Sequence, residues 1–135
     1  MNVFTVDNNL VDLAKEHLVS NYAKGEKSVA AIIKTDDGRI FKAMNSRHFA
    51  NTLCAELSAI ILLINSEKIA IGPITIVAVI MNEENIPSVA NSCGRCRQVI
   101  ADMFSDARFI INADGILKNL GIDEILPFRY KKKVS

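Results

Sequence analysis

The spacing of hydrophobic residues changes along the chain and predicts an alternation of helices and strands. Apolar residues recur at helical spacing between positions 7 and 22, which predicts an amphipathic opening helix. Two runs with the composition of strands, residues 28–35 and 39–45, flank the turn signal Asp36-Asp37-Gly38. This arrangement predicts a β-hairpin.

The rest of the chain continues the alternation. Residues 54–66 form an apolar run that is too long for a typical strand, so they are predicted to form a buried helix. Residues 74–81 are rich in β-branched and apolar side chains, as in a central strand covered on both faces. The remaining predicted elements are a helix over 93–104 with Ser92 as its N-cap, a strand over 108–111, a turn over 113–115 and a helical turn over 123–126.

This order of elements is typical of an α/β sandwich built around a mixed sheet. With 135 residues, half of them hydrophobic, the chain is expected to form a single domain over residues 1–135. Each of the two central helices follows a strand, and the carboxyl ends of parallel strands lie at one edge of a sheet. If those strands are parallel, Cys54 meets Cys93 and Cys96 at that edge.

Composition excludes several classes of partner. The 16 Lys and Arg residues against 15 Asp and Glu leave a net charge of +1, so we expect no nucleic-acid partner. The basic run 131–133 is interpreted as a solvated tail. The longest apolar segment, 69–81, is interrupted by Gly72-Pro73 and is shorter than the ~20 residues of a spanning helix, so we expect no membrane partner. Acidic and amide residues near the N-terminus interrupt any secretory signal, so a cytoplasmic location is expected.

The cysteines carry the first indication of chemistry. There are three of them, an odd number that cannot all pair within the chain. Cys93 and Cys96 form a C-x-x-C at a predicted helix start, where unpaired backbone N–H groups favour thiolates. A redox dithiol, a structural zinc site and a catalytic zinc site all use this spacing, and three small buried apolar side chains are the simplest alternative. Because Cys54 is predicted at the same edge, a metal is favoured, and three protein ligands are typical of catalytic zinc.

Other polar residues near the cysteines have candidate roles. Glu56 follows Cys54 by two residues, so at a helix start it can take a proton from a zinc-activated water and deliver it to the reacting molecule. Its alternative role is a favourable interaction with the helix dipole. Three thiolates outweigh the charge of Zn²⁺, so Arg95 and Arg97 are expected to donate to sulfur, with a solvated surface position as the alternative for Arg97. His48 is interpreted as a packing or substrate-contacting residue rather than a ligand.

The segments CAE at 54–56 and CGRCRQ at 93–98, at this separation, resemble the zinc-dependent cytidine deaminase family. The resemblance extends over residues 28–130. It implies a three-layer α-β-α sandwich with a five-stranded mixed sheet, a homotetramer, and hydrolysis of the 4-amino group of a small-molecule cytosine nucleoside. It also implies that Glu56 transfers protons and that Zn²⁺ is bound by Cys54, Cys93 and Cys96.

The departures from the family pattern concern the substrate. Asn45 matches an asparagine that contacts the sugar, but the run 45–48 lacks the glutamate that commonly holds the ribose. Leu57 stands where cytidine deaminases commonly have an arginine. The segments CAEL, CGRCRQV and EILPFRY look more like blasticidin S deaminases, relatives that act on an aminoacyl cytosine nucleoside, and in that subgroup Arg95 would compensate the thiolate charge. The residues expected to contact substrate are Asn45, Arg47, Ala55, Ser92 and Tyr130.

The resemblance leaves the sugar or acyl part of the substrate open. The fungal blasticidin S enzymes have an arginine before their Pro-Cys that can meet the carboxylate of the antibiotic, but residues 82–92 here contain no Lys or Arg. A non-catalytic zinc-stabilised nucleoside-binding or sensor module is the alternative function. A dithiol redox protein is a further one, although it leaves Cys54 and Glu56 unexplained.

Overall fold

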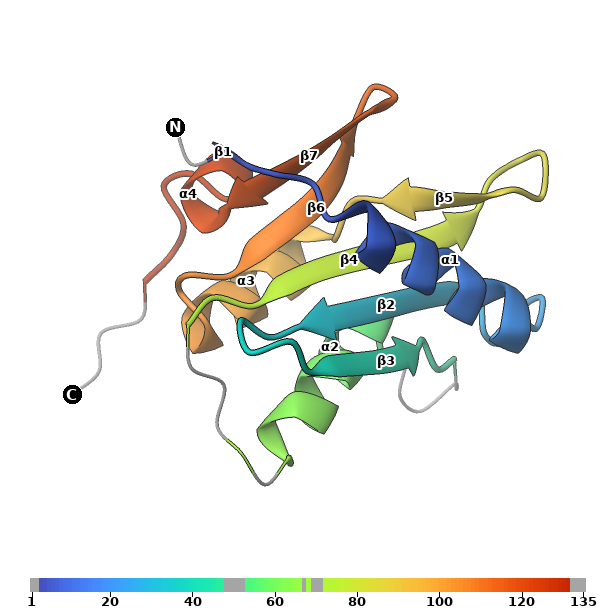
Figure 1. Ribbon diagram of the computed structural model, residues 1–135, viewed down its shortest axis with the longest axis horizontal. Coiled ribbons are helices and arrows are strands. Elements are labelled where there is room, and N and C mark those ends of the chain that lie inside the picture. The colour runs from blue at the N-terminus through green and yellow to red at the C-terminus, as the bar shows by residue number, and fades with distance from the viewer. Residues whose placement is uncertain (1–2, 48–52, 67, 69–71, 132–135) are drawn as a thin grey trace.

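The computed structural model describes residues 3–47, 53–66, 68 and 72–131 (Figure 1). The helices are α1 (Asn8–Asn21), α2 (Ala55–Ile64), α3 (Gly94–Met103) and α4 (Ile122–Ile125). The strands are β1 (Val3–Phe4), β2 (Val29–Lys34), β3 (Ile40–Met44), β4 (Thr75–Met81), β5 (Pro87–Ala90), β6 (Arg108–Ala113) and β7 (Ile116–Gly121). Within these residues, no helix is long and apolar enough to cross a membrane.

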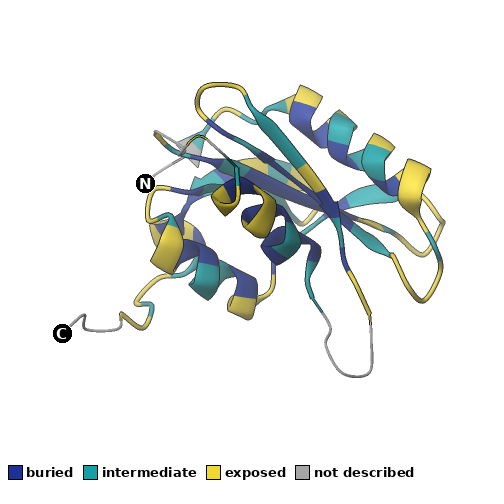
Figure 2. Ribbon diagram, turned by 90° about the horizontal axis from the view of Figure 1, so that it is seen from below, coloured by how far each residue is buried: buried dark blue, intermediate teal, exposed yellow. Residues whose placement is uncertain are grey.

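The elements form three layers, as expected. Helix α1 covers one face of the sheet, and α2 and α3 cover the other, with buried residues turned inward from both sides (Figure 2). The core beneath α1 contains Leu10, Leu18, Ile32, Val77, Val79 and Ile110. The core on the opposite face contains Ile33, Ile60, Ile74, Ile76, Ile100 and Phe109. Strands β2 and β4 supply side chains to both cores, which explains their continuous apolar pattern.

The sheet is mixed and open, with the order β1-β7-β6-β4-β2-β3. Strands β3, β2, β4, β6 and β7 make up the five-stranded sheet that the resemblance implies, and β1 and β5 extend it. The predicted hairpin is confirmed as β2 and β3, and β4 pairs antiparallel with β2, so β3 and β4 run in the same direction. The carboxyl ends of β3 and β4 therefore lie at one edge of the sheet, as we expected.

Strand β4 is shared between two neighbours on the side away from β2. Its first half, Thr75–Val77, pairs in parallel with β6, whereas its second half, from Ala78 onward, pairs antiparallel with β5. The chain therefore turns back along β4 before α3 begins. Our prediction that α3 follows β4 directly is wrong, because β5 lies between them. The start of α3 is thereby brought to the middle of β4 (Figure 1).

A row of small residues crosses the sheet on the face covered by α2. Ala31 of β2 lies directly opposite Ala43 of β3 and Ala78 of β4, and Ala78 lies opposite Ala90 of β5. Directly opposed residues point to the same face, so these alanines form a continuous shallow strip. Ala55, at the first turn of α2, packs with Ala31 and Ala78. Side chains limited to a methyl group therefore let the N-terminus of α2 approach the sheet closely.

The helix starts differ in how they are capped. Asp7 caps α1 by accepting a hydrogen bond from the N–H of Leu10 at 3.1 Å, and its carboxylate also pairs with Lys34 at 3.0 Å. The prediction that Ser92 caps α3 is wrong, because the chain remains extended through Cys93 and that cysteine occupies the N-cap position. Ser92 is instead buried in the preceding segment.

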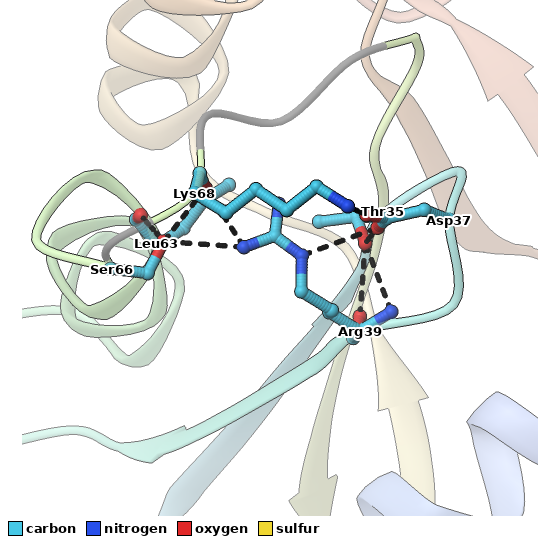
Figure 3. A network of polar contacts seen from close by, with 6 residues as sticks. All are labelled: Thr35, Asp37, Arg39, Leu63, Ser66 and Lys68. Atoms are coloured by element: carbon cyan, nitrogen blue, oxygen red, sulfur yellow. Dashed lines mark hydrogen bonds and ion pairs between the residues drawn. The ribbon is translucent and has the colours of Figure 1, made fainter.

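A polar network fastens the turn of the β2–β3 hairpin to the C-terminal end of α2 (Figure 3). The Asp37 carboxylate accepts from Thr35, pairs with Arg39 at 3.2 Å and pairs with Lys68 at 3.1 Å. The Arg39 guanidinium also donates to the carbonyl of Lys68 at 2.8 Å. The segment just after α2 is thus held to the hairpin by one ion pair and by the hydrogen bond from Arg39, while the N-terminal end of the helix rests on the alanines.

Candidate metal centre and active site

The three cysteines converge in space. The Sγ atoms of Cys54, Cys93 and Cys96 all lie within 4.8 Å of one another, and those of Cys93 and Cys96 are 3.6 Å apart. Tetrahedral Zn²⁺ with Zn–S bonds of ~2.3 Å requires sulfur atoms roughly 3.8 Å apart. The thiols therefore fit a zinc ion with little rearrangement.

The position of Cys54 follows from the packing of α2. Cys54 is the N-cap of that helix, and its carbonyl accepts from both the N–H and the hydroxyl of Ser58, each at 3.0 Å. The next residue, Ala55, is fully buried against the alanine strip. Cys54 is thus fixed relative to the sheet by the contact of its neighbour Ala55 with Ala31 and Ala78.

The position of Cys93 follows from the return of the chain along β4. Between β5 and α3, the side chain of Asn91 accepts from the N–H of Asn112 at 2.8 Å and donates to the carbonyl of Asn112 at 3.0 Å. Asn91 thus joins the end of β5 to β6, just beyond the point where β6 stops pairing with β4. This pair of bonds holds the segment that leads into Cys93, and Asn91 was not among the residues that we predicted.

The thiols have different environments. The backbone N–H groups at the start of α3, that of Cys96 above all, lower the pKa of the Cys93 thiol. Burial raises the pKa of the Cys96 thiol, and the negative charge of Glu56 raises it further. Glu56 itself is 6% exposed and sits in the first turn of α2. A buried carboxylate whose charge acts on these thiols is placed to exchange protons beside the metal.

A cavity of about 270 Å³ opens beside the thiols. It brings together six residues that the sequence singles out, namely Asn45, Arg47, Cys54, Ala55, Glu56 and Cys93. It also contains residues that we did not predict, namely Val29, Leu53, Ala78, Ile80, Ala90 and Asn91. The pairing of Val29 with Ile80 and of Ala78 with Ala90 across the sheet explains their presence, and only the strand register reveals it.

The expected substrate-contacting residues are not all alike in position. The side-chain Oδ1 of Asn45 accepts from the backbone N–H groups of Ser28 and Val29 at 2.8 and 2.9 Å, so this side chain holds the end of β3 to β2 while the residue lines the cavity. Arg47 is exposed at the same cavity. Tyr130 is 73% exposed, and its backbone carbonyl accepts from Gln98. His48 lies outside the described residues.

The two arginines beside the cysteines also differ. Arg95 is exposed on α3. Arg97 donates to the carbonyl of Ile125 at 2.8 Å, which ties α3 to α4, and its buried Nε has no hydrogen-bond partner among the described residues. The direct donation from these arginines to sulfur remains a prediction.

A larger cavity, about 420 Å³, lies near the start of β6 and the end of β7. Its lining includes Phe4, Arg108 and Asp123 but none of the cysteines. We place the active site at the smaller cavity because that is where ligand atoms and a buried carboxylate coincide.

The site combines three thiols that fit zinc, a buried carboxylate beside them and a cavity lined by strands of a mixed sheet. This combination is typical of a zinc-dependent hydrolase with an α/β fold. Residues 5–112 match the family model described as the cytidine and deoxycytidylate deaminase zinc-binding region. The chain therefore belongs to this family and is a zinc-dependent deaminase.

Individual relatives are similar to the chain over most of its length. The chain is 29% identical to a blasticidin-S deaminase of Bacillus cereus, over 97% of this chain and 96% of the relative. It is similar in fold to the cytidine deaminase of Bacillus anthracis, with a TM-score of 0.72, 22% identity and coverage of 91% of this chain and 88% of the other. It is also similar to the cytidine deaminase of Mycobacterium tuberculosis, with a TM-score of 0.69, 23% identity and coverage of 95% and 100%.

Proposed function

We propose that this protein hydrolyses the 4-amino group of a cytosine nucleoside, releasing ammonia and the corresponding uracil compound. The observation that carries the proposal is the convergence of three thiols beside a cavity that Cys54, Cys93 and buried Glu56 line. The candidate substrates are cytidine, deoxycytidine and an aminoacyl cytosine nucleoside such as blasticidin S. The similarity to a blasticidin-S deaminase over nearly the whole chain supports inclusion of the last of these.

The residues divide the work of the reaction. Zn²⁺ held by Cys54, Cys93 and Cys96 supplies a Lewis acid that makes water nucleophilic near neutral pH. Glu56 accepts a proton from the attacking water and delivers it to the ring nitrogen, then accepts the proton of the hydroxyl group formed on C4 and delivers it to the amino group, which leaves as ammonia. The apolar walls formed by Val29 and Ile80 favour a flat ring over bulk water. Asn45 and Arg47 are left to contact the sugar side.

Replacement of Glu56 by Gln tests this division. The variant keeps the shape of the side chain but cannot accept the proton, so kcat should fall by about 10²–10⁴-fold, or roughly 3–5 kcal/mol in barrier. Elemental analysis should still find zinc in the variant, because glutamate is not a ligand. Glu83→Gln, which removes the same charge from the exposed β4–β5 turn, is the matched control and should retain activity.

The assay is ammonia release from zinc-loaded protein with cytidine, deoxycytidine and blasticidin S. Full activity in Glu56→Gln would contradict the assignment of Glu56. Nucleoside binding without ammonia release from any substrate would support the sensor alternative. Absence of stoichiometric zinc from the purified protein would support the redox alternative.

We also infer that the protein forms a homotetramer and works in the cytoplasm. Exposed apolar side chains on α2 support self-association, since Ile61, Leu62 and Ile64 are 42%, 48% and 51% exposed. A site that needs three reduced thiols supports a reducing compartment. Native mass spectrometry of the zinc-loaded protein, at several concentrations, tests the tetramer.

A further inference from the structure

The outer part of the active-site cavity is built differently from its inner part. Glu56 and the thiols lie at the helix starts, whereas Asn45 and Arg47 come from the end of β3. Arg47 is the only cationic residue in the described lining of this cavity. The cavity therefore has an acidic inner end and a basic outer end.

A second cavity, of about 220 Å³, adjoins the first and shares two of its residues. Asn45 and Arg47 line both, and the other residues of the second cavity are Glu26, Lys27 and Ser46. Two cations against one carboxylate give this space a net positive lining. No carboxylate among the described residues forms an ion pair with Arg47 or Lys27 within 4.0 Å.

Asn45, the other residue that the two cavities share, has less freedom to bind a ligand. The side-chain oxygen of Asn45 already accepts from two backbone N–H groups. Only its side-chain NH₂ group, near the Ser28 hydroxyl, is left to bind a ligand. The guanidinium of Arg47 carries five N–H donors in a planar fork that suits carboxylate and phosphate oxygens. At this end of the cavity, an anionic group is therefore a better binding partner for the protein than a neutral hydroxyl group.

The charge at the inner end of the active-site cavity determines the orientation in which an anionic nucleoside enters. Three thiolates exceed the charge of Zn²⁺, and Glu56 adds a further negative charge, so an anionic group is repelled there. The neutral cytosine ring is acceptable at the inner end, while an anionic group on the sugar would reach the space shared by Arg47 and Lys27.

We propose that Arg47 selects cytosine nucleosides that carry an anionic group, a carboxylate or a phosphate, on the sugar. This inference rests on the proposed function and names its substrate class. Arg47 acts as a specificity-determining residue, and Lys27 assists it through charge. Neutral cytidine and deoxycytidine are then poorer substrates than their anionic counterparts.

The test compares kcat/KM for deoxycytidine and deoxycytidine 5′-monophosphate, for cytidine and cytidine 5′-monophosphate, and for blasticidin S as the carboxylate source. Arg47→Gln should lower the ratio of anionic to neutral kcat/KM by about 10–100-fold, mostly through KM. Arg47→Glu should lower it further, and Arg47→Lys should restore part of it. Lys118→Gln, which removes one positive charge from exposed β7, should leave the ratio unchanged.

Binding separates this proposal from the proposed function. Calorimetry of zinc-loaded wild-type protein with deoxycytidine and its monophosphate measures selectivity even if no ammonia is released. Tighter binding of the monophosphate or of blasticidin S, lost in Arg47→Gln, supports anion selection, and the preferred probe identifies phosphate or carboxylate as the source. Equal affinity for neutral and anionic ligands, or an equal loss for both in Arg47→Gln, would overturn it.

Discussion

Enlargement of Ala31 to Val should weaken zinc binding although Ala31 touches no metal. Ala31 is fully buried beneath Ala55 in the strip where α2 rests on the sheet. Two additional carbon atoms at this point have no space unless the first turn of α2 moves away or β2 distorts. Because Cys54 precedes Ala55, movement of that turn separates its thiol from those on α3.

The size of the effect follows from the cost of overpacking. Extra methyl groups in a filled core typically cost about 1–3 kcal/mol. In the metal-free protein, α2 can relieve part of that strain by moving outward. Zinc binding pulls Cys54 back and restores the strain, so zinc affinity should fall by up to roughly 5–150-fold, the equivalent of about 1–3 kcal/mol.

Ala30→Val is the matched control. Ala30 is the neighbouring residue of β2, is equally buried, and faces the core beneath α1 instead. Both variants should lose stability in urea unfolding, but competition with a chromogenic chelator should show weaker zinc binding only for Ala31→Val. Equal zinc affinity in the two variants would refute the idea that the alanine strip positions the metal ligands.

Three further results are expected. Removal of zinc by a chelator should lower Tm by roughly 10 °C relative to protein in free zinc at 100 times Kd, since that excess contributes about 2.7 kcal/mol, and a Tm unaffected by chelator would argue against a structural contribution from the metal. Asp7→Ala should cost about 1 kcal/mol or more in urea unfolding, because it removes the cap of α1 and the partner of Lys34, whereas Asp12→Ala in the exposed part of the same helix should cost much less. The hydrogen bond from Thr35 and the pairs with Lys68 and Arg39 hold the pKa of Asp37 well below its usual 3.8, so its stabilising contribution is complete above about pH 4 and is lost as the pH falls further. Asp37→Asn should therefore lose less stability on acidification than the wild type. Parallel curves of stability against pH for the two proteins would contradict this.

The sequence predicts the elements that contain long apolar runs. Helix α2 and strand β4 are found because their runs are largely apolar and most of their residues are buried, and their bounds differ from the expected ones by only a few residues. Strand β5 is missed because Pro87 and Ser88 give it neither strand composition nor length. Strand β7 is missed because Lys118, Asn119 and Gly121 dilute its apolar pattern.

The turn before β7 is a partial success. The prediction of a turn at 113–115 is supported by positive φ at Asp114 and Gly115, which a tight hairpin turn requires. The Asp-Gly pair is a hairpin signal in its own right, so it could have revealed the strand that follows. Tertiary context, in the form of β6 and β1 on either side, makes that weak strand stable.

The metal site is predictable mainly because it depends on local spacing. Cys54 and Cys93 both stand at helix starts, as predicted, but the strand before α3 is β5, which runs antiparallel to β4. Cys93 therefore reaches the site through the return of the chain along β4, which we did not predict from the sequence. The bond between Arg97 and the carbonyl of Ile125 depends on where α4 docks, which no local pattern fixes. The contribution of Asn91 depends in the same way on the pairing of β5 and β6 with different halves of β4.

Because β4 pairs with both β6 and β5, the segment that positions Cys93 is separate from the turn between β4 and β5. The register of β5 on β4 and the attachment of Asn91 to β6 fix the approach to Cys93, so the turn over 82–86 can change in length or sequence without moving a metal ligand. Arg47 likewise lies beyond the last pair of β3. Libraries that vary Arg47 and residues 82–86 should therefore yield folded, zinc-binding proteins at high frequency, which makes this chain a practical starting point for deaminases with altered substrates.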